Sequence, residues 1–385
     1  MVLNRPPMGW NSWNTFGKEI NETVILESAE ALVSSGLADA GYRYVVIDDC
    51  WALRERDLHG NLVPDPKKFP HGMKSLGERI HAMGLKFGMY SCCGLMTCAG
   101  YPSSLDREWQ DAQTFAEWGV DYLKYDYCFR PQNRKGEELY RAMGLALANC
   151  GREIVFAACS WGADETEKWI GTSGADTWRS TADVFDNWQS VKRAALKQFS
   201  LLPYRKKGCF NDMDMLVVGM NGNGNVGLGG CTFTEYTTHF SAWCLFQSPL
   251  FIGCDVRNIS DEILSLLKNK ALIGIDQDEK CTQVYCMPAC MAWEEDGDQL
   301  FAVVRLLADG DLAVGLFNFT EQERNAVCLL NDLGLGVRSC KRVQLTDCLT
   351  GAKSFSRNGV IEAVLPPHGS VVYRAKIISE QGILP

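Results

Sequence analysis

The chain has 385 residues, of which 46% are hydrophobic and 22% are charged, and its formal net charge at pH 7 is −9. This length is too great for one small core, and it predicts two or three domains or one barrel with an appendage. The acidic balance and the lack of a Lys/Arg run exclude a nucleic-acid partner, because phosphate backbones require a basic surface.

Short apolar strands alternate with amphipathic helices along most of the chain. In chain order, we expect strands at residues 8–10, 44–47, 85–90, 121–125, 154–157, 177–179, 209–211 and 250–252. Helical patterns cover residues 22–35, 75–83, 106–118, 137–149, 187–198, 235–246 and 260–270. Strands separated by such helices form parallel βαβ units, and eight units predict a closed (β/α)8 or TIM barrel, the catalytic domain, over residues 1–278.

The pattern changes after Asp276. From there the sequence shows short alternating strands with turn signals, such as LFAVVRLL and DLAVGLFNF, and no long helix. This pattern is typical of an antiparallel β-sandwich, which we expect over residues 279–385 as a C-terminal domain that packs on the barrel.

Polar residues follow the expected barrel strands, where the mouth of a (β/α)8 barrel holds its active site. In strand order they are Asp48 and Asp49, Tyr90, Lys124 and Asp126, Ser160 and Trp161, Arg179 and Asp183, Asp212 and Asp214, and Asp255. Carboxylates, cations and aromatic rings together suit a sugar, and two carboxylates can cleave a glycosidic bond. Asp255 and Asp186 are better explained as caps of the helices that follow them.

The fourth strand is the most informative. Lys124 and Asp126 are two residues apart, so their side chains lie on one face of the strand. We expect this face to point into the barrel mouth, where the cation keeps the carboxylate ionised as a nucleophile requires. A structural salt bridge inside the barrel is the alternative interpretation.

The N-terminus shows no secretion signal, and no apolar stretch is long enough to span a membrane. Seventeen cysteines at irregular spacing do not form a disulfide framework, so we expect a reduced, cytoplasmic protein. Neither Cys92-Cys93 nor the group Cys281, Cys286 and Cys290 has the paired spacing of zinc ligands, and we expect no metal site.

Five long motifs resemble glycoside hydrolase family 27, the α-galactosidases and α-N-acetylgalactosaminidases, over nearly the whole chain. They are PPMGWNSWNTF, YVVIDDCW, GVDYLKYDYC, TWRSTADVFDNW and SPLFIGCDVR, in the family's order. The resemblance implies a retaining double displacement, with Asp126 as nucleophile, Asp183 as acid/base and no metal or organic cofactor. The substrate-binding residues that it implies are Trp13, Asp48, Asp49, Tyr90, Lys124 and Arg179. It also implies that Cys98 and Cys128 lie beside the site, where secreted relatives have a disulfide.

The chain departs from the family at three places. Lys18 stands where the usual disulfide partner of Cys50 would be, so that disulfide cannot form. Cys92 replaces an Asp two residues after Tyr90, which puts the hydrogen bonding around the third strand in doubt. Ser160 replaces the Glu of a CEW motif that reads the sugar's 2-position.

The third departure bears on the substrate. Ser160 with Ala163, beside Trp161, resembles the arrangement of relatives that accept a 2-acetamido group, but Asp164 stands where those relatives have a Tyr. We therefore expect an α-galactosidase that acts on oligosaccharides or glycoconjugates. An α-N-acetylgalactosaminidase is the alternative, and a β-L-arabinopyranosidase activity is a further one.

Two other functional classes fit the sequence less well. A non-catalytic sugar-binding protein would not need both Asp126 and Asp183. A phosphate-binding isomerase would need a basic glycine-rich loop, whereas the glycine-rich stretch 219–230 has no basic residue. We expect this stretch to form the rim of the pocket or a subunit contact, so a homo-oligomer stays open, and we expect a small carbohydrate as the partner.

Overall fold

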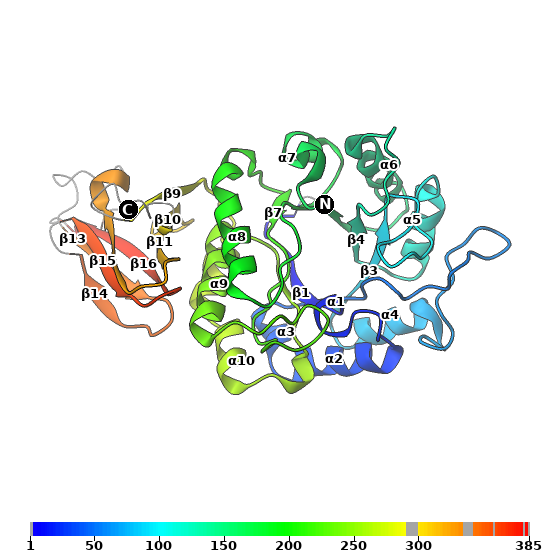
Figure 1. Ribbon diagram of the computed structural model, residues 1–385, viewed down its shortest axis with the longest axis horizontal. Coiled ribbons are helices and arrows are strands. Elements are labelled where there is room, and N and C mark those ends of the chain that lie inside the picture. The colour runs from blue at the N-terminus through cyan, green and yellow to red at the C-terminus, as the bar shows by residue number, and fades with distance from the viewer. Residues whose placement is uncertain (1–2, 290–298, 334–341, 357–358, 380–381, 384–385) are drawn as a thin grey trace.

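The computed structural model describes residues 3–289, 299–333, 342–356, 359–379 and 382–383 (Figure 1). Its first part is one parallel eight-stranded sheet in the order β7-β6-β5-β4-β3-β2-β1-β8. The strands are β1 (Met8–Asn11), β2 (Tyr44–Val46), β3 (Lys86–Cys92), β4 (Tyr122–Asp126), β5 (Val155–Cys159), β6 (Thr177–Arg179), β7 (Phe210–Asp212) and β8 (Leu250–Ile252). Each lies within two residues of its expected position, which confirms the predicted barrel.

The barrel closes through the segment that follows β7. Leu216 donates its backbone N–H to the carbonyl of Phe251 at 2.7 Å, and Gly253 donates to the carbonyl of Leu216 at 2.9 Å. Three residues, 213–215, therefore separate the end of β7 from this contact. These three residues lie outside the strand, at the barrel mouth.

Helices follow the strands and cover the barrel. They include α2 (Glu22–Ser34), α4 (Gly72–Ala82), α5 (Glu108–Glu117), α6 (Gly136–Ala148), α8 (Trp188–Lys197), α9 (Phe233–Phe246), α10 (Asp261–Leu267) and α11 (Lys270–Asp276). The prediction of one helix at 260–270 was wrong, because two helices, α10 and α11, cover this region. Asn269 accepts hydrogen bonds from the N–H groups of Ala271 and Leu272 and so caps a second helix. In the described part of the chain, no helix has the length and apolar character needed to cross a membrane.

A second, antiparallel domain follows the barrel, as predicted. One of its sheets has the order β14-β13-β16-β11-β10-β9, with β17 beside β16, and β12 pairs with β15. Their bounds are β9 (Val284–Pro288), β10 (Leu300–Leu306), β11 (Leu312–Asn318), β12 (Arg324–Leu329), β13 (Arg342–Asp347), β14 (Lys353–Phe355), β15 (Val360–Leu365), β16 (Ser370–Ser379) and β17 (Gly382–Ile383). Ala326 and Ile361 from the pair pack with Val314 and Val343 of the larger sheet in one apolar cluster, as in a sandwich.

The two domains share a tight junction. Figure 1 shows α8 and α9 between the barrel and the second domain. Arg305 of β10 is fully buried and donates to the carbonyl of Ile275 at 3.0 Å, and Lys192 of α8 donates to the carbonyl of Phe319 at 2.9 Å. These contacts hold α11 and α8 against the second domain.

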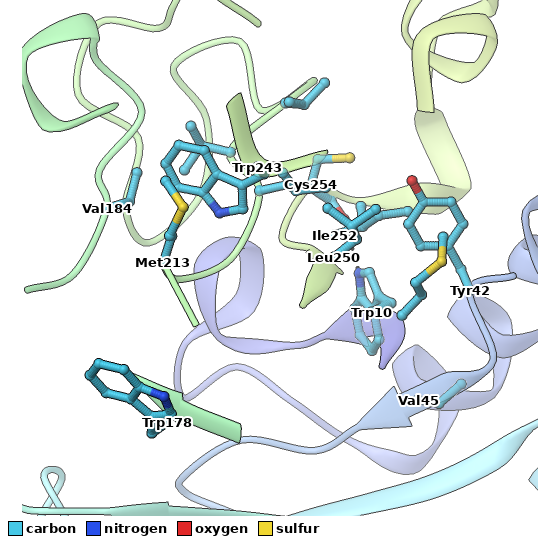
Figure 2. Packing of buried hydrophobic residues seen from close by; sticks show 14 of the residues in the cluster. Trp10, Tyr42, Val45, Trp178, Val184, Met213, Trp243, Leu250, Ile252 and Cys254 are labelled. Atoms are coloured by element: carbon cyan, nitrogen blue, oxygen red, sulfur yellow. Dashed lines mark hydrogen bonds between the residues drawn. The ribbon is translucent and has the colours of Figure 1, made fainter. Parts of the chain in front are cut away.

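Buried tryptophans brace the strand ends (Figure 2). The indole N–H of Trp10 donates to the carbonyl of Cys254 at 2.9 Å, and that of Trp243 donates to the carbonyl of Asp214 at 2.7 Å. Trp178 of β6 is fully buried in the same apolar cluster. Because strand side chains alternate, the neighbouring Arg179 points to the opposite side, into the barrel.

Candidate active site

The carboxyl ends of the barrel strands surround a pocket of about 470 Å³. Its lining residues are Trp13, Asn14, Asp48, Asp49, Tyr90, Cys98, Lys124, Asp126, Cys159, Trp161, Arg179, Asp183, Asp214, Met215 and Val226. The pocket thus brings together all the site residues expected from the sequence except Cys128, Ser160 and Ala163.

Strand register explains which side chains face the pocket. In the parallel pairing of β4 with β5, Lys124 lies opposite Ala157 and Asp126 lies opposite Cys159. Residues paired in this way point to the same face of a sheet. Cys159 therefore joins Lys124 and Asp126 at the mouth, and its neighbour Ser160 turns away.

Asp126 is buried, and donors surround its carboxylate. Oδ2 accepts a hydrogen bond from the Tyr90 hydroxyl at 3.0 Å, and Oδ1 accepts from the N–H of Tyr127 at 2.9 Å. Burial raises the pKa of Asp126 to about 6, although Lys124 and the Tyr127 N–H both lower it. The carboxylate is therefore mostly ionised only at a pH above about 6.

Lys124 does not contact Asp126 directly, contrary to the simplest expectation. Its Nζ lies 2.8 Å from Oδ2 of Asp48, which also accepts from Asn11 Nδ2 at 2.8 Å. Lys124 therefore acts on Asp126 only through its longer-range field, and burial outweighs that field. The prediction that Lys124 keeps the carboxylate of Asp126 ionised is therefore corrected: Lys124 lowers the pKa of Asp126, but burial raises that pKa by more.

The neighbouring carboxylates Asp48 and Asp49 have the donors that such a pair requires. Asp48 Oδ1 accepts from the N–H of Asp49 at 2.9 Å. Asp49 accepts from the N–H groups of Cys50 at 2.7 Å and Ala99 at 2.9 Å. Burial still raises the pKa of Asp49 above its ordinary value.

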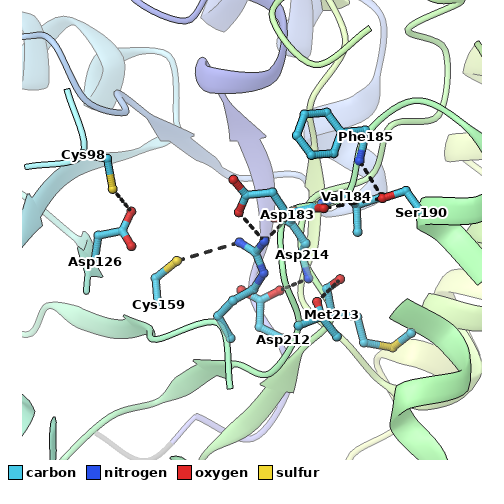
Figure 3. Close-up of polar contacts among 12 residues, drawn as sticks. Cys98, Asp126, Cys159, Asp183, Val184, Phe185, Ser190, Asp212, Met213 and Asp214 are labelled. Carbon is cyan, nitrogen blue, oxygen red and sulfur yellow. Dashed lines mark hydrogen bonds and ion pairs between the residues drawn. The ribbon is translucent and has the colours of Figure 1, made fainter. Parts of the chain in front are cut away.

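One guanidinium group joins two carboxylates on the other side of the pocket. Figure 3 shows Asp126 and Cys98 on one side of Cys159, and Asp183 and Asp214 on the other. Arg179 Nη2 lies 2.8 Å from Asp183 Oδ1 and 2.7 Å from Asp214 Oδ2. The side chain of Asp183 is 55% exposed, whereas that of Asp214 is only 4% exposed, so only Asp183 is in contact with bulk solvent.

These two carboxylates have opposite pKa shifts. Burial raises the pKa of Asp183, but Arg179 and Lys124 lower it by more, so the net pKa lies below the ordinary carboxyl value. Burial raises the pKa of Asp214 to about 7 despite Arg179, and the charge of Asp183 adds to that rise. Asp183 is therefore the less basic of the two carboxylates.

Cys98 and Cys128 form a disulfide beside Asp126, and Cys98 Sγ lies 3.5 Å from Oδ2 of Asp126. The sequence left open whether this pair is oxidised, and the fold brings the two sulfur atoms together in a disulfide. Cys50, Cys281 and Cys286 are among the cysteines that stay free, whereas Cys290 lies outside the described residues. The Cys92 thiol donates to the carbonyl of Cys128 at 3.3 Å, which supplies the hydrogen bond in doubt at the third strand.

Ser160 does not reach the pocket, so its expected role in substrate binding is corrected. It is fully buried, and its Oγ lies 2.6 Å from the Thr166 hydroxyl, which also donates to the carbonyl of Ala163. Trp161, which has a left-handed backbone (φ 57°), and Cys159 form this wall of the pocket instead. The end position of Cys159 on its strand was the signal that could have identified it.

The glycine-rich stretch contributes Val226 to the pocket rim, as expected. Val226 donates to the carbonyl of Asn14 at 3.1 Å. The buried carboxylate of Asp186 anchors the stretch, because it accepts from the N–H groups of Gly222 at 2.7 Å and Cys231 at 3.1 Å. Asp186 therefore holds a loop rather than capping a helix, whereas Asp255 does cap its short helix through the N–H of Arg257.

Two other lining residues, Asn14 and Met215, were not expected from the sequence, and Asp214 was expected at the barrel mouth but with no role. Asp214 and Met215 belong to the three residues that leave the strand path after β7, and Asp214 has a left-handed backbone (φ 83°). No periodic pattern in the sequence marks such a departure.

Known proteins match the chain over both domains. Residues 5–278 match a family described as alpha galactosidase A, and residues 298–375 match the alpha galactosidase C-terminal beta sandwich domain. An alpha-galactosidase of Oryza sativa is 41% identical over 369 residues, which are 96% of this chain and 84% of that protein.

Solved structures agree with this match. The crystal structure of alpha-galactosidase I from Mortierella vinacea has a TM-score of 0.86 and 31% identity, and covers 97% of both chains. A structure of the Saccharomyces cerevisiae alpha-galactosidase with raffinose has a TM-score of 0.84 and 29% identity. It covers 97% of this chain and 98% of the yeast chain.

Proposed function

Because this chain belongs to the alpha-galactosidase family, we propose that it hydrolyses terminal α-linked galactose from oligosaccharides or glycoconjugates with retention of anomeric configuration. The observation that carries the proposal is the pairing of two different carboxylates at one pocket. Asp126 is buried and surrounded by donors, whereas Asp183 is half exposed at the opening. Two carboxyl groups with separate environments are what a double displacement requires.

Asp126 is the nucleophile in this proposal. Its carboxylate attacks the anomeric carbon, and the bond from that carbon to the leaving oxygen breaks with its electron pair on the oxygen. The Tyr90 hydroxyl and the N–H of Tyr127 fix the two carboxylate oxygens, so that the attacking lone pair needs little reorganisation.

Asp183 is the acid/base. It donates its proton to the departing oxygen, and it then takes a proton from the water that releases galactose from Asp126. Its 55% exposure suits this role, because the leaving group departs and the water enters through the open side of the pocket.

The remaining lining residues bind the sugar. The Asp48 and Asp49 carboxylates accept hydroxyl protons, and Lys124 and Arg179 supply donors. Trp13 and Trp161 supply apolar walls for the sugar ring. Cys159 and Trp161 form the wall where Ser160 had been expected. The structure therefore gives no support to a space for an acetamido group lined by Ser160. This observation favours galactose over N-acetylgalactosamine.

The test is hydrolysis of 4-nitrophenyl α-galactoside against 4-nitrophenyl α-N-acetylgalactosaminide. We expect a strong preference for the galactoside and a loss of at least about 1,000-fold in Asp126→Ala. Asp57→Asn is the matched control, since this carboxylate lies on an exposed loop and accepts from the N–H groups of His59 and Asn61 in the same loop. Proton NMR of the first product then decides the stereochemistry. The α-anomer supports retention, and the β-anomer contradicts it.

A further inference from the structure

Asp214 lines the pocket, but the double displacement gives it no role. We propose that Asp214 is a positioning residue for the acid/base step, acting as the counter-ion of Arg179 so that Asp183 can hold the proton that the leaving group needs. This inference rests on the proposed function and assigns a further residue to the same reaction.

The geometry places Asp183 and Asp214 in competition for one donor. The same nitrogen of Arg179, Nη2, lies 2.8 Å from Asp183 and 2.7 Å from Asp214. The Arg179 side chain is only 3% exposed, so water cannot replace either partner freely. A buried guanidinium that loses all its counter-ions is strongly destabilised.

Asp214 is held in place from three directions. Its Oδ2 accepts from the N–H of Val184 at 2.6 Å, and its own N–H donates to Asp212 Oδ1 at 2.8 Å. Its carbonyl accepts from the indole of Trp243 at 2.7 Å. These bonds hold a left-handed backbone (φ 83°) at a residue that is not glycine, which is a strained conformation. Asp183 has no such anchors on its carboxylate, because Arg179 is its one side-chain partner among the described contacts.

Charge balance gives this arrangement its function. While both carboxylates are ionised, the group of three carries one net negative charge, so it binds a proton readily. If Asp183 takes that proton, Arg179 and Asp214 remain as a neutral pair. Without the charge of Asp214, protonation of Asp183 would leave Arg179 buried and unpaired, so Asp183 would resist protonation.

Burial raises the pKa of Asp214 to about 7 while the pKa of Asp183 lies below its ordinary value, so Asp214 is the more readily protonated of the two in the free protein. A bound sugar removes water from the half-exposed Asp183 and so favours its neutral form. Four other charged or titratable groups, on neighbouring strands, interact electrostatically with these two carboxylates or with Arg179. They are Lys124, Asp126, Cys159 and Asp212. The proton then passes from Asp183 to the leaving oxygen, as that oxygen's bond to the anomeric carbon breaks and Asp126 forms its own bond.

The test compares two substrates in Asp214→Asn. Phenyl α-galactoside has a poor leaving group that needs the acid, whereas 2,4-dinitrophenyl α-galactoside has a good one that does not. We expect kcat/KM to fall by about 100-fold for the phenyl substrate and by less than about 10-fold for the dinitrophenyl substrate. The high-pH limb of kcat/KM should also move to lower pH by about one unit, because the remaining acid is Asp183 alone.

Two more variants complete the design. Asp214→Ser removes the same charge with a smaller side chain, and it replaces the Asn variant if that variant does not melt cooperatively. Asp214→Glu keeps the charge, so its high-pH limb should stay within about 0.3 units of the wild type even if its rate is lower. If the neutral variants lose activity equally on both substrates and keep the wild-type limb, Asp214 has only a structural role and the inference is overturned. If the wild-type protein hydrolyses neither galactoside, the proposed function fails instead.

Discussion

Tyr90 donates its hydroxyl hydrogen to Oδ2 of Asp126 at 3.0 Å, and both residues are buried. The two residues lie on adjacent strands, where Tyr90 of β3 pairs with Lys124 of β4, two residues before Asp126. The barrel register therefore places a neutral hydrogen-bond donor on the carboxylate of Asp126. Lys124, the cation whose charge lowers the pKa of Asp126, is bound to Asp48. Hydrogen bonds, rather than an ion pair, orient the carboxylate that we propose as the nucleophile.

Tyr90→Phe should raise the pKa of Asp126 above its value of about 6, because the lost hydrogen bond favours the ionised carboxylate. The low-pH limb of kcat/KM should move to higher pH, and kcat/KM at the optimum should fall by about 10- to 100-fold. A pH–rate profile with 4-nitrophenyl α-galactoside checks both effects. Tyr101→Phe is the control, since that ring stacks under Arg54 and does not line the pocket. A limb that does not move in Tyr90→Phe would rule out this role for Tyr90.

Asp126→Asn should stabilise the protein at neutral pH. The folded-state pKa of Asp126 is about 6 against an ordinary value of 3.8, so the folded form binds this proton more tightly than the unfolded form does. Stability contributed by this group is therefore full below pH 3.8 and declines as pH rises to about 6. Removing the charge should increase the free energy of unfolding at pH 7 by about 1–3 kcal/mol. Urea unfolding at pH 7 and pH 4 measures it, and a gain of equal size at both values would contradict the linkage.

Loss of the Cys98–Cys128 disulfide should lower both stability and activity. The bond closes a loop with a sequence separation of 30 residues, for which chain entropy predicts a contribution of at most about 3–4 kcal/mol. Activity should fall because Cys98 Sγ contacts Asp126 Oδ2. Urea unfolding and kcat/KM of Cys128→Ser, compared with Cys281→Ser as a free-cysteine control, test both effects. A Cys128→Ser protein as stable and active as the control would show that the bond has neither role.

Trp161→Ala should change substrate preference, whereas Ser160→Ala should not. Trp161 lines the pocket, so its removal makes room beside the sugar and takes away an apolar contact. We expect about 10-fold or greater loss on the galactoside, with a smaller loss on the N-acetylgalactosaminide. Ser160 is buried against Thr166 and should leave the ratio of the two rates unchanged. A shift of that ratio in Ser160→Ala would restore the 2-position role expected from the sequence.

Much of the fold and part of the site follow from local patterns in the chain. Strand and helix periods predict the eight barrel units, because each period reports which side of an element is buried. The polar residues at the strand ends predict the mouth, since all parallel strands of a barrel end on one side. Asp126, Arg179 and Asp183 were identifiable on these grounds together with the family resemblance.

Tertiary structure alone decided the finer points. The register between β4 and β5 turns Cys159 into the pocket and Ser160 away from it, and register depends on contacts between distant strands. The fold also brings Cys98 within bonding distance of Cys128 and places Asp214 on Arg179. Asp214 reaches that position through a left-handed backbone that Trp243 and Val184 hold in place. Such a conformation costs energy locally and is stabilised by residues far along the chain, so no local pattern in the sequence can indicate it.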